Sequence, residues 1–121
     1  MKDNNRRRAV HAAIGRLQEL SELFLRRRTE LATEVGLSEQ QWRVLEEISA
    51  EHFMPSLFAR SRQSSPAAVS KIIRQLVEKE LISVSISSDD GRQRRYLLTA
   101  RGKRVMGQLR ALRQQAIERV W

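Results

Sequence analysis

Cysteine is absent from this chain of 121 residues, and proline occurs only twice. Without cysteine there can be no disulfide, no thiolate nucleophile, no cysteine-ligated metal site and no thiol redox switch. No apolar run approaches the roughly 20 residues of a membrane-spanning helix, and no apolar stretch typical of a signal peptide follows Arg6, Arg7 and Arg8. These absences predict a soluble, cytoplasmic protein.

Acidic residues are scarce relative to basic ones. The chain has 14 of them against 23 lysines and arginines, which gives a net charge of +9 and a sequence pI near 11.3. This excess favours a polyanionic partner, nucleic acid or an anionic membrane, although a basic protein can also be merely soluble. The apolar share of 40% is enough for one modest core, so the length predicts a single domain over residues 1–121.

The N-terminal third of the sequence has apolar residues at helical spacing. This periodicity predicts a helix over residues 10–33, after a frayed polar segment at 1–8 and before Gly36. The apolar stripe of the predicted helix consists of Val10, Ile14, Leu17 and Phe24.

The next helix has a clear start. Ser38 and Gln41 have the spacing of a capping box, and Leu37 and Trp42 have that of a hydrophobic staple. A helix is therefore predicted from here to about Ala50, with Trp42 in the core rather than stacked on a ligand.

Two further helices are indicated by proline. A short helix follows Pro55, and after a polar turn Ser65 and Pro66 provide the cap and first position of another. One face of this later helix is apolar and comprises Val69, Ile72, Ile73 and Leu76. The opposite face comprises Ala67, Ala68, Ser70, Lys71, Arg74 and Gln75.

The period then changes from helical to alternating. Residues 82–87 alternate strictly between apolar residues and serine, which predicts a strand with one buried face. Asp89, Asp90 and Gly91 indicate a turn, after which Tyr96 and Leu98 alternate in a returning strand. The predicted hairpin has arginines at its tip, namely Arg92, Arg94 and Arg95. Thr99 caps a last helix, whose apolar residues include Val105, Leu109, Leu112, Ala116 and Val120.

Helix, turn, helix and hairpin in this order predict a mainly α (α+β) fold, a winged helix-turn-helix with a two-stranded wing. Such a helix fits the major groove of DNA with its N-terminal residues nearest the base edges, and a basic wing can reach the adjacent minor groove. The predicted core for binding double-stranded DNA is 37–98. Its contact residues are Ser64, Ser65, Ala67, Ala68, Ser70, Lys71, Arg74, Asp90, Arg92 and Arg94.

The first and last helices, at 10–33 and 99–121, are predicted to form a homodimer. A small core cannot cover two long amphipathic helices, and exposed apolar stripes are usually buried against a partner. Packing of both helices within one chain is the alternative. The predicted interface consists of Val10, Ile14, Leu17, Phe24, Val105, Leu109, Leu112 and Val120.

Three segments resemble the MarR family of bacterial regulators. They are LSEQQWRVLEEI (37–48), SSPAAVSKIIRQLVEKELI (64–82) and DDGRQRRYLLTARG (89–102), in the family's order and spacing. The resemblance implies that Arg92 contacts DNA and that Asp90 holds the wing. It also implies a homodimer, in agreement with the apolar stripes, and a small aromatic or phenolic effector that weakens DNA binding.

The sequence departs from the family pattern in its turns and at its end. Arg62, Gln63 and Ser64 replace leucine, glycine and an aliphatic residue, so the turn is more polar than usual. Glu80 replaces a common glycine, and a left-handed conformation there would cost about 1 kcal/mol. The sequence ends at Trp121, before the family's final helix, so we expect either a smaller dimer interface or a truncated chain.

No constellation in the sequence supports catalysis, a cofactor or a metal. His11 and His52 lack partners at ligand spacing, and Glu46, Glu47 and Glu51 have the pattern of solvated ion-pairing positions. The sequence therefore predicts a transcriptional regulator that acts as a repressor, and not an enzyme. The alternatives are a winged-helix module that binds another regulator and, less favoured, a binder of double-stranded RNA, whose narrow major groove excludes a helix.

Overall fold

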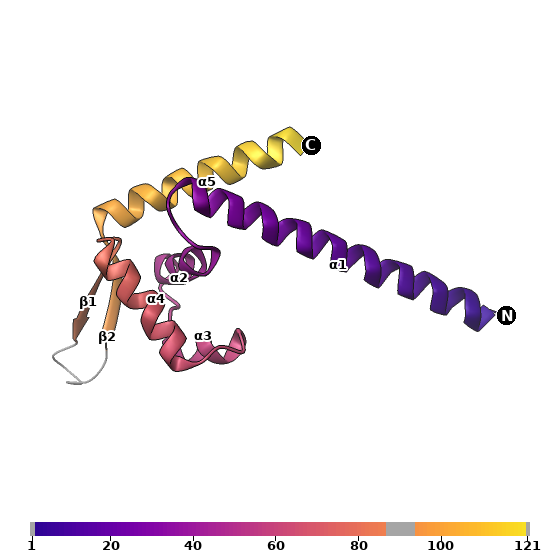
Figure 1. The fold of residues 1–121 in the computed structure, drawn as a ribbon, viewed down its shortest axis with the longest axis horizontal. Coiled ribbons are helices and arrows are strands. Elements are labelled where there is room, and N and C mark those ends of the chain that lie inside the picture. The colour runs from indigo at the N-terminus through magenta and orange to yellow at the C-terminus, as the bar shows by residue number, and fades with distance from the viewer. Residues whose placement is uncertain (1, 87–93, 121) are drawn as a thin grey trace.

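The computed structural model describes residues 2–86 and 94–120, with the side chain of Val120 left out. Its elements are α1 (Lys2–Glu34), α2 (Glu39–Ser49), α3 (Pro55–Ser61), α4 (Pro66–Glu78), β1 (Ile82–Ile86), β2 (Arg94–Leu98) and α5 (Ala100–Val120). In Figure 1, α1 extends away from the rest of the chain, while α2, α3, α4 and the hairpin lie together below α5. The predicted winged-helix fold class is confirmed. None of the helices described combines the length and apolarity that crossing a membrane requires.

The first helix begins earlier than predicted. The expectation of a frayed segment at 1–8 is wrong, because α1 starts at Lys2 and continues without a break to Glu34. The early start has a local cause. Arginine and alanine favour helix, no proline or glycine precedes Gly15, and Asp3 in the first turn complements the helix dipole.

Helices α1 to α4 end through the same backbone motif. After α1, α2, α3 and α4 the chain passes through one left-handed residue, Gly36 (φ 77°), Glu51 (φ 60°), Gln63 (φ 51°) or Glu80 (φ 59°). In each case the next amide donates to a carbonyl oxygen five residues earlier, at 2.8–3.0 Å. This is the Schellman arrangement, which satisfies carbonyl groups at a helix end. Glu80, which stands where the family commonly has glycine, takes the left-handed conformation.

The second helix starts as the sequence predicts. The Ser38 hydroxyl accepts a hydrogen bond from the Gln41 amide and the Gln41 side chain accepts one from the Ser38 amide, both at 3.0 Å. Trp42 is 1% exposed and lies in the core. That core joins α2, α3 and α4 to the ends of α1 and α5 and to the start of β1. Its buried residues are Ala32, Leu37, Trp42, Val44, Leu45, Ile48, Phe58, Ala59, Val69, Ile72, Leu76, Leu81, Ile82, Met106 and Leu109.

The hairpin is confirmed, but its predicted buried face is wrong beyond the first residue. The strands pair antiparallel, from Ile82 opposite Leu98 to Ile86 opposite Arg94. Only Ile82 of β1 is buried, whereas Val84 and Ile86 are 39% and 67% exposed. Burial ends here because the hairpin extends past the helices that cover its base (Figure 1).

The last helix begins at the predicted cap. The Thr99 hydroxyl accepts a hydrogen bond from the Gly102 amide at 3.0 Å. Val105 and Leu112 are half-buried, whereas Leu109 is 0% exposed and belongs to the core of its own chain. The prediction of Leu109 as a dimer contact is therefore wrong, because none of its surface is left for a partner.

Candidate nucleic-acid interface

The turn before α4 is held by its backbone rather than by apolar side chains. The Ser64 amide donates to the Ala59 carbonyl oxygen at 2.8 Å, and Gln63 takes the left-handed conformation. Ser65 then caps α4, since its hydroxyl accepts a hydrogen bond from the Ala68 amide at 3.1 Å, and Pro66 occupies the first turn. The polar residues at 62–64, which depart from the family pattern, are thus compatible with a well-formed turn.

The two faces of α4 divide largely as predicted. Val69, Ile72 and Leu76 are buried, which fixes the helix on the core. The residues predicted to contact DNA from this helix are exposed, namely Ala67, Ala68, Ser70, Lys71 and Arg74, and so is Ser65, whereas Ser64 is half-buried. Small side chains therefore surround the N-terminal end of α4, and the two cations follow one turn later.

The sequence predicts Gln75 on the face of α4 opposite the apolar one, with the DNA-contact residues, and this prediction is wrong. Gln75 is half-buried, and its side-chain oxygen accepts a hydrogen bond from the Gln41 side-chain nitrogen at 2.8 Å. Gln41 thus serves two purposes, because its oxygen completes the cap of α2 while its nitrogen holds α4. The capping-box spacing predicts the first purpose, and no signal in the sequence predicts the second.

An open groove lies between the exposed face of α4 and the second strand of the wing. Four predicted residues line it, Ala67, Ser70, Arg74 and Arg94, together with Pro55, Ile73 and Tyr96. The structure thus brings Arg94 of β2 beside Arg74 of α4. Pro55, Ile73 and Tyr96 belong to this surface although the sequence pattern does not assign them to it, and Ile73 is predicted on the apolar face of the helix.

The alternation of β2 explains which arginine faces α4. Arg94 and Tyr96 are two residues apart and so lie on one face of the strand, while Arg95 lies on the other. Tyr96 is anchored by an edge-to-face contact with Phe53, whose ring centroid is 5.2 Å away. Arg94 and Arg95 belong to the strand rather than to the tip, which corrects their predicted position. Asp90 and Arg92 lie outside the described residues.

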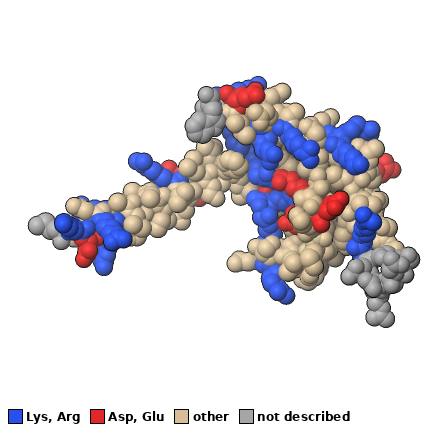
Figure 2. Space-filling model, turned by 180° about the vertical axis from the view of Figure 1, so that it is seen from behind, with Lys and Arg blue, Asp and Glu red and all other residues tan. Residues whose placement is uncertain are grey.

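The positive charge of the groove between α4 and β2 is not neutralised by ion pairs with carboxylates among the described residues. Within residues 2–86 and 94–120, no ion pair involves Lys71, Arg74 or Arg94. Figure 2 shows the protein from behind, with basic side chains around a smaller group of acidic ones on the part of the chain that excludes the projecting length of α1. Basic side chains also gather at the N-terminal end of α1. In the same described part of the chain, no three metal-ligating side chains form a cluster. The surface is suited to an extended polyanion.

Comparison with known proteins identifies a family and a shared architecture. The model of the MarR family matches residues 35–93. Similar solved structures include RV1404 from Mycobacterium tuberculosis, which is 24% identical with a TM-score of 0.78, covering 92% of this chain and 78% of that one. No curated protein matches the sequence.

Two further similar structures were solved with ligands. Staphylococcus aureus MarR in complex with salicylate and kanamycin is 20% identical, with a TM-score of 0.76 over 93% of this chain and 75% of that one. A mutant of Escherichia coli MarR complexed with operator DNA is 20% identical, with a TM-score of 0.70 over 88% and 77%. At these identities the likeness concerns the fold.

Proposed function

The chain belongs to the MarR family, by its residues 35–93, and we propose that it is a sequence-specific regulator of transcription that binds double-stranded DNA as a homodimer. The observation that supports this function best is the groove between α4 and β2, where exposed arginines of helix and wing lie together without carboxylate partners among the described residues. A related fold, the Escherichia coli MarR mutant, was solved complexed with operator DNA.

The geometry suggests how DNA would be bound. In this proposal α4 enters the major groove, where Ala67, Ala68 and Ser70 allow its backbone close to the base edges. Lys71 and Arg74 reach phosphates or guanine. Arg94 extends the contact onto the wing, and the resemblance adds Arg92 at the minor groove.

The dimer is proposed from the surface of α1. Its predicted stripe, Val10, Ile14, Leu17 and Phe24, is 47–67% exposed, and Leu20, Leu23 and Leu25 enlarge it. Half-buried Leu112 and exposed Ile117 on α5 would add to the same contact. A two-fold contact would place two copies of α4 about one turn of DNA apart, so the expected site is an inverted repeat.

Release by a small aromatic or phenolic effector, and hence repression, is part of this proposal. The groove offers apolar Pro55, Ile73 and the ring of Tyr96 beside two guanidinium groups. An aromatic carboxylate placed there would compete with phosphate for the same arginines. Staphylococcus aureus MarR, of similar fold, was solved with salicylate.

The test is selection of bound sequences from a random pool of double-stranded DNA. Binding to the recovered site is then measured by fluorescence anisotropy at several salt concentrations. We expect an inverted repeat, and Arg74→Ala, which removes one contact from each protomer, should weaken binding by roughly 1–3 kcal/mol per half-site and reduce the salt slope of the dimer by about 2.

Arg113→Ala is the matched control, because it removes one exposed arginine of α5 and should leave affinity for DNA unchanged. Recovery of no sequence, with weak binding that is equally insensitive to both substitutions, would contradict the proposal. It would favour the alternative of a winged-helix module that binds another protein.

A further inference from the structure

The long first helix is joined to the body near one end only. Helix α1 contacts α2 and α5, and its only buried residue is Ala32, with Leu31 packed beside it. The turn into α2 is only four residues, 35–38, and both of its ends are closed by the Schellman motif and the capping box. Whatever fixes α1 against α2 therefore fixes the direction of the whole projecting helix (Figure 1).

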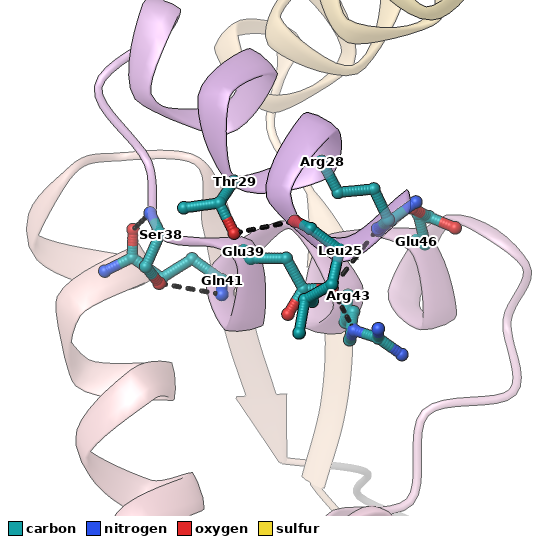
Figure 3. Close-up of polar contacts among 8 residues, drawn as sticks. All are labelled: Leu25, Arg28, Thr29, Ser38, Glu39, Gln41, Arg43 and Glu46. Atoms are coloured by element: carbon teal, nitrogen blue, oxygen red, sulfur yellow. Dashed lines mark hydrogen bonds and ion pairs between the residues drawn. The ribbon is translucent and has the colours of Figure 1, made fainter. Parts of the chain in front are cut away.

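Arg28 connects α1 to α2 at three points, and Figure 3 shows two of them, the contacts with Glu39 and Glu46. Its Nε donates to Glu39 Oε1 at 3.2 Å and its Nη2 donates to Glu46 Oε1 at 2.6 Å. Between these carboxylates its guanidinium carbon lies 3.8 Å from the ring centroid of Trp42. Arg43 pairs with the same oxygen of Glu39. One side chain of α1 thus contacts α2 along two of its turns.

The Arg28 contacts are withdrawn from solvent. The side chains of Arg28 and Glu39 are 14% and 11% exposed, so salt screens their attraction less than that of surface pairs. The sequence pattern indicates a solvated ion-pairing position for Glu46, and the structure confirms the pairing, with 37% of the Glu46 side chain exposed. Arginine has a planar fork that can donate to two carboxylates while its guanidinium carbon lies over an indole ring, whereas lysine offers a single point charge.

A small movement of α1 at Arg28 becomes a larger movement at the N-terminal end of the helix, because that end lies farther from the turn at Gly36. Arg28 is about 12 Å from Gly36 and Lys2 is about 50 Å from it, at 1.5 Å per residue. A displacement of about 1 Å at Arg28 would therefore become about 4 Å at the N-terminal end. In a dimer formed through α1, the same rotation would move one DNA-binding core relative to the other.

We propose that Arg28 is a positioning residue that sets which half-site spacing the dimer accepts. By joining Glu39 and Glu46 across Trp42, it fixes the angle at which α1 leaves the DNA-binding core, and thereby the separation and phase of the two α4 helices. This inference rests on the proposed function, because spacing has meaning only for a dimer on paired half-sites.

The experiment uses the full chain and the inverted repeat recovered from the DNA pool. Affinity is measured for this repeat and for versions with the spacer shortened or lengthened by one base pair, which moves a half-site by about 3.4 Å and about 35°. Unmodified chain should lose about tenfold or more in affinity on each change. Arg28→Gln and Arg28→Lys should lose less than about threefold, with unchanged affinity for a single half-site.

Arg27→Gln is the matched control. Arg27 is the neighbouring residue, its side chain is 65% exposed, and it contacts only Glu30, at 3.8 Å, among the described ion pairs. This control should keep the sharp spacing preference. If the Arg28 variants match it while the unmodified chain discriminates spacers, the inference is overturned and the proposed function stands. If the unmodified chain binds no DNA, the proposed function fails, and the inference about spacing fails with it.

A second measurement tests the angle of α1 without DNA. Since the chain has no cysteine, cysteines introduced at exposed Gln18 and Ser56 can carry spin labels on α1 and α3. Labelled chains are diluted with unlabelled ones so that distances within one chain dominate. Arg28→Gln should broaden the distance distribution relative to Arg27→Gln, and equal widths would overturn the positioning role.

Discussion

Gly102 lies in the first turn of α5, where the helix passes directly over the backbone of Leu81. A Cβ at this position would overlap the Leu81 carbonyl oxygen and lie 3.1 Å from its carbonyl carbon. The oxygen cannot easily move, because it accepts a hydrogen bond from the Thr99 amide at 3.0 Å, and the Leu81 amide donates to Leu76 at the same distance. Alanine normally gains about 1 kcal/mol over glycine within a helix. Relief of the overlap should cost about 1–3 kcal/mol, and loss of the Thr99 bond about 1 more, so we expect a net loss of about 2 kcal/mol.

Gly107→Ala is the matched control for Gly102→Ala in the same helix. No heavy atom lies within 4 Å of the Cβ that it would add, so only the helix-propensity gain of about 0.5–1 kcal/mol should remain. Urea unfolding followed by circular dichroism, at one protein concentration for all variants, measures the free energies of unfolding. A Gly102→Ala protein at least as stable as Gly107→Ala would refute the close approach of α5 to Leu81.

Three further predictions concern DNA binding, assembly and capping. Ala68→Glu places a carboxylate on the exposed N-terminal face of α4 and should abolish DNA binding in an anisotropy titration while the circular dichroism stays unchanged. Leu17→Asp changes a residue that is 65% exposed and should give folded monomers by light scattering, whereas Leu109→Asp should unfold the chain because that residue is fully buried. Ser38→Ala removes the hydroxyl that accepts from Gln41 and should lower the free energy of unfolding by about 1 kcal/mol, with most of it restored by threonine.

The elements of the fold were predictable wherever their causes are local. The starts of α2 and α4 follow from Ser38 and Ser65, because a cap depends on residues three positions apart. The apolar period predicts the buried face of α4, and the change to alternation predicts β1. The exposed contact residues of α4 are predictable for the same reason, since they are the complement of its buried face.

The misplaced residues depend on tertiary packing, which the sequence pattern does not contain. The stripe of α5 that includes Leu109 has the same period whether it faces its own core or a partner. Gln75 is polar, yet it is half-buried because Gln41 lies opposite it in space. Val84 and Ile86 alternate correctly, but the helices that would cover them end too soon. Arg28 is one of 23 basic residues in the sequence, and its contacts with α2 appear only once the helices are placed.

The helix ends at Glu51, Gln63 and Glu80 have a consequence for how the protein can change. A left-handed conformation costs a residue other than glycine about 1 kcal/mol, and glycine adds about 0.4 kcal/mol or more of entropy to the unfolded chain at each position. Glycine at all three positions should therefore raise the free energy of unfolding by up to about 2 kcal/mol. None of these residues is buried, and the turns already have the geometry that glycine prefers. A few substitutions in the turns could therefore compensate for destabilising changes on the exposed face of α4. Such a reserve would let the exposed face of α4 diverge before the fold is lost.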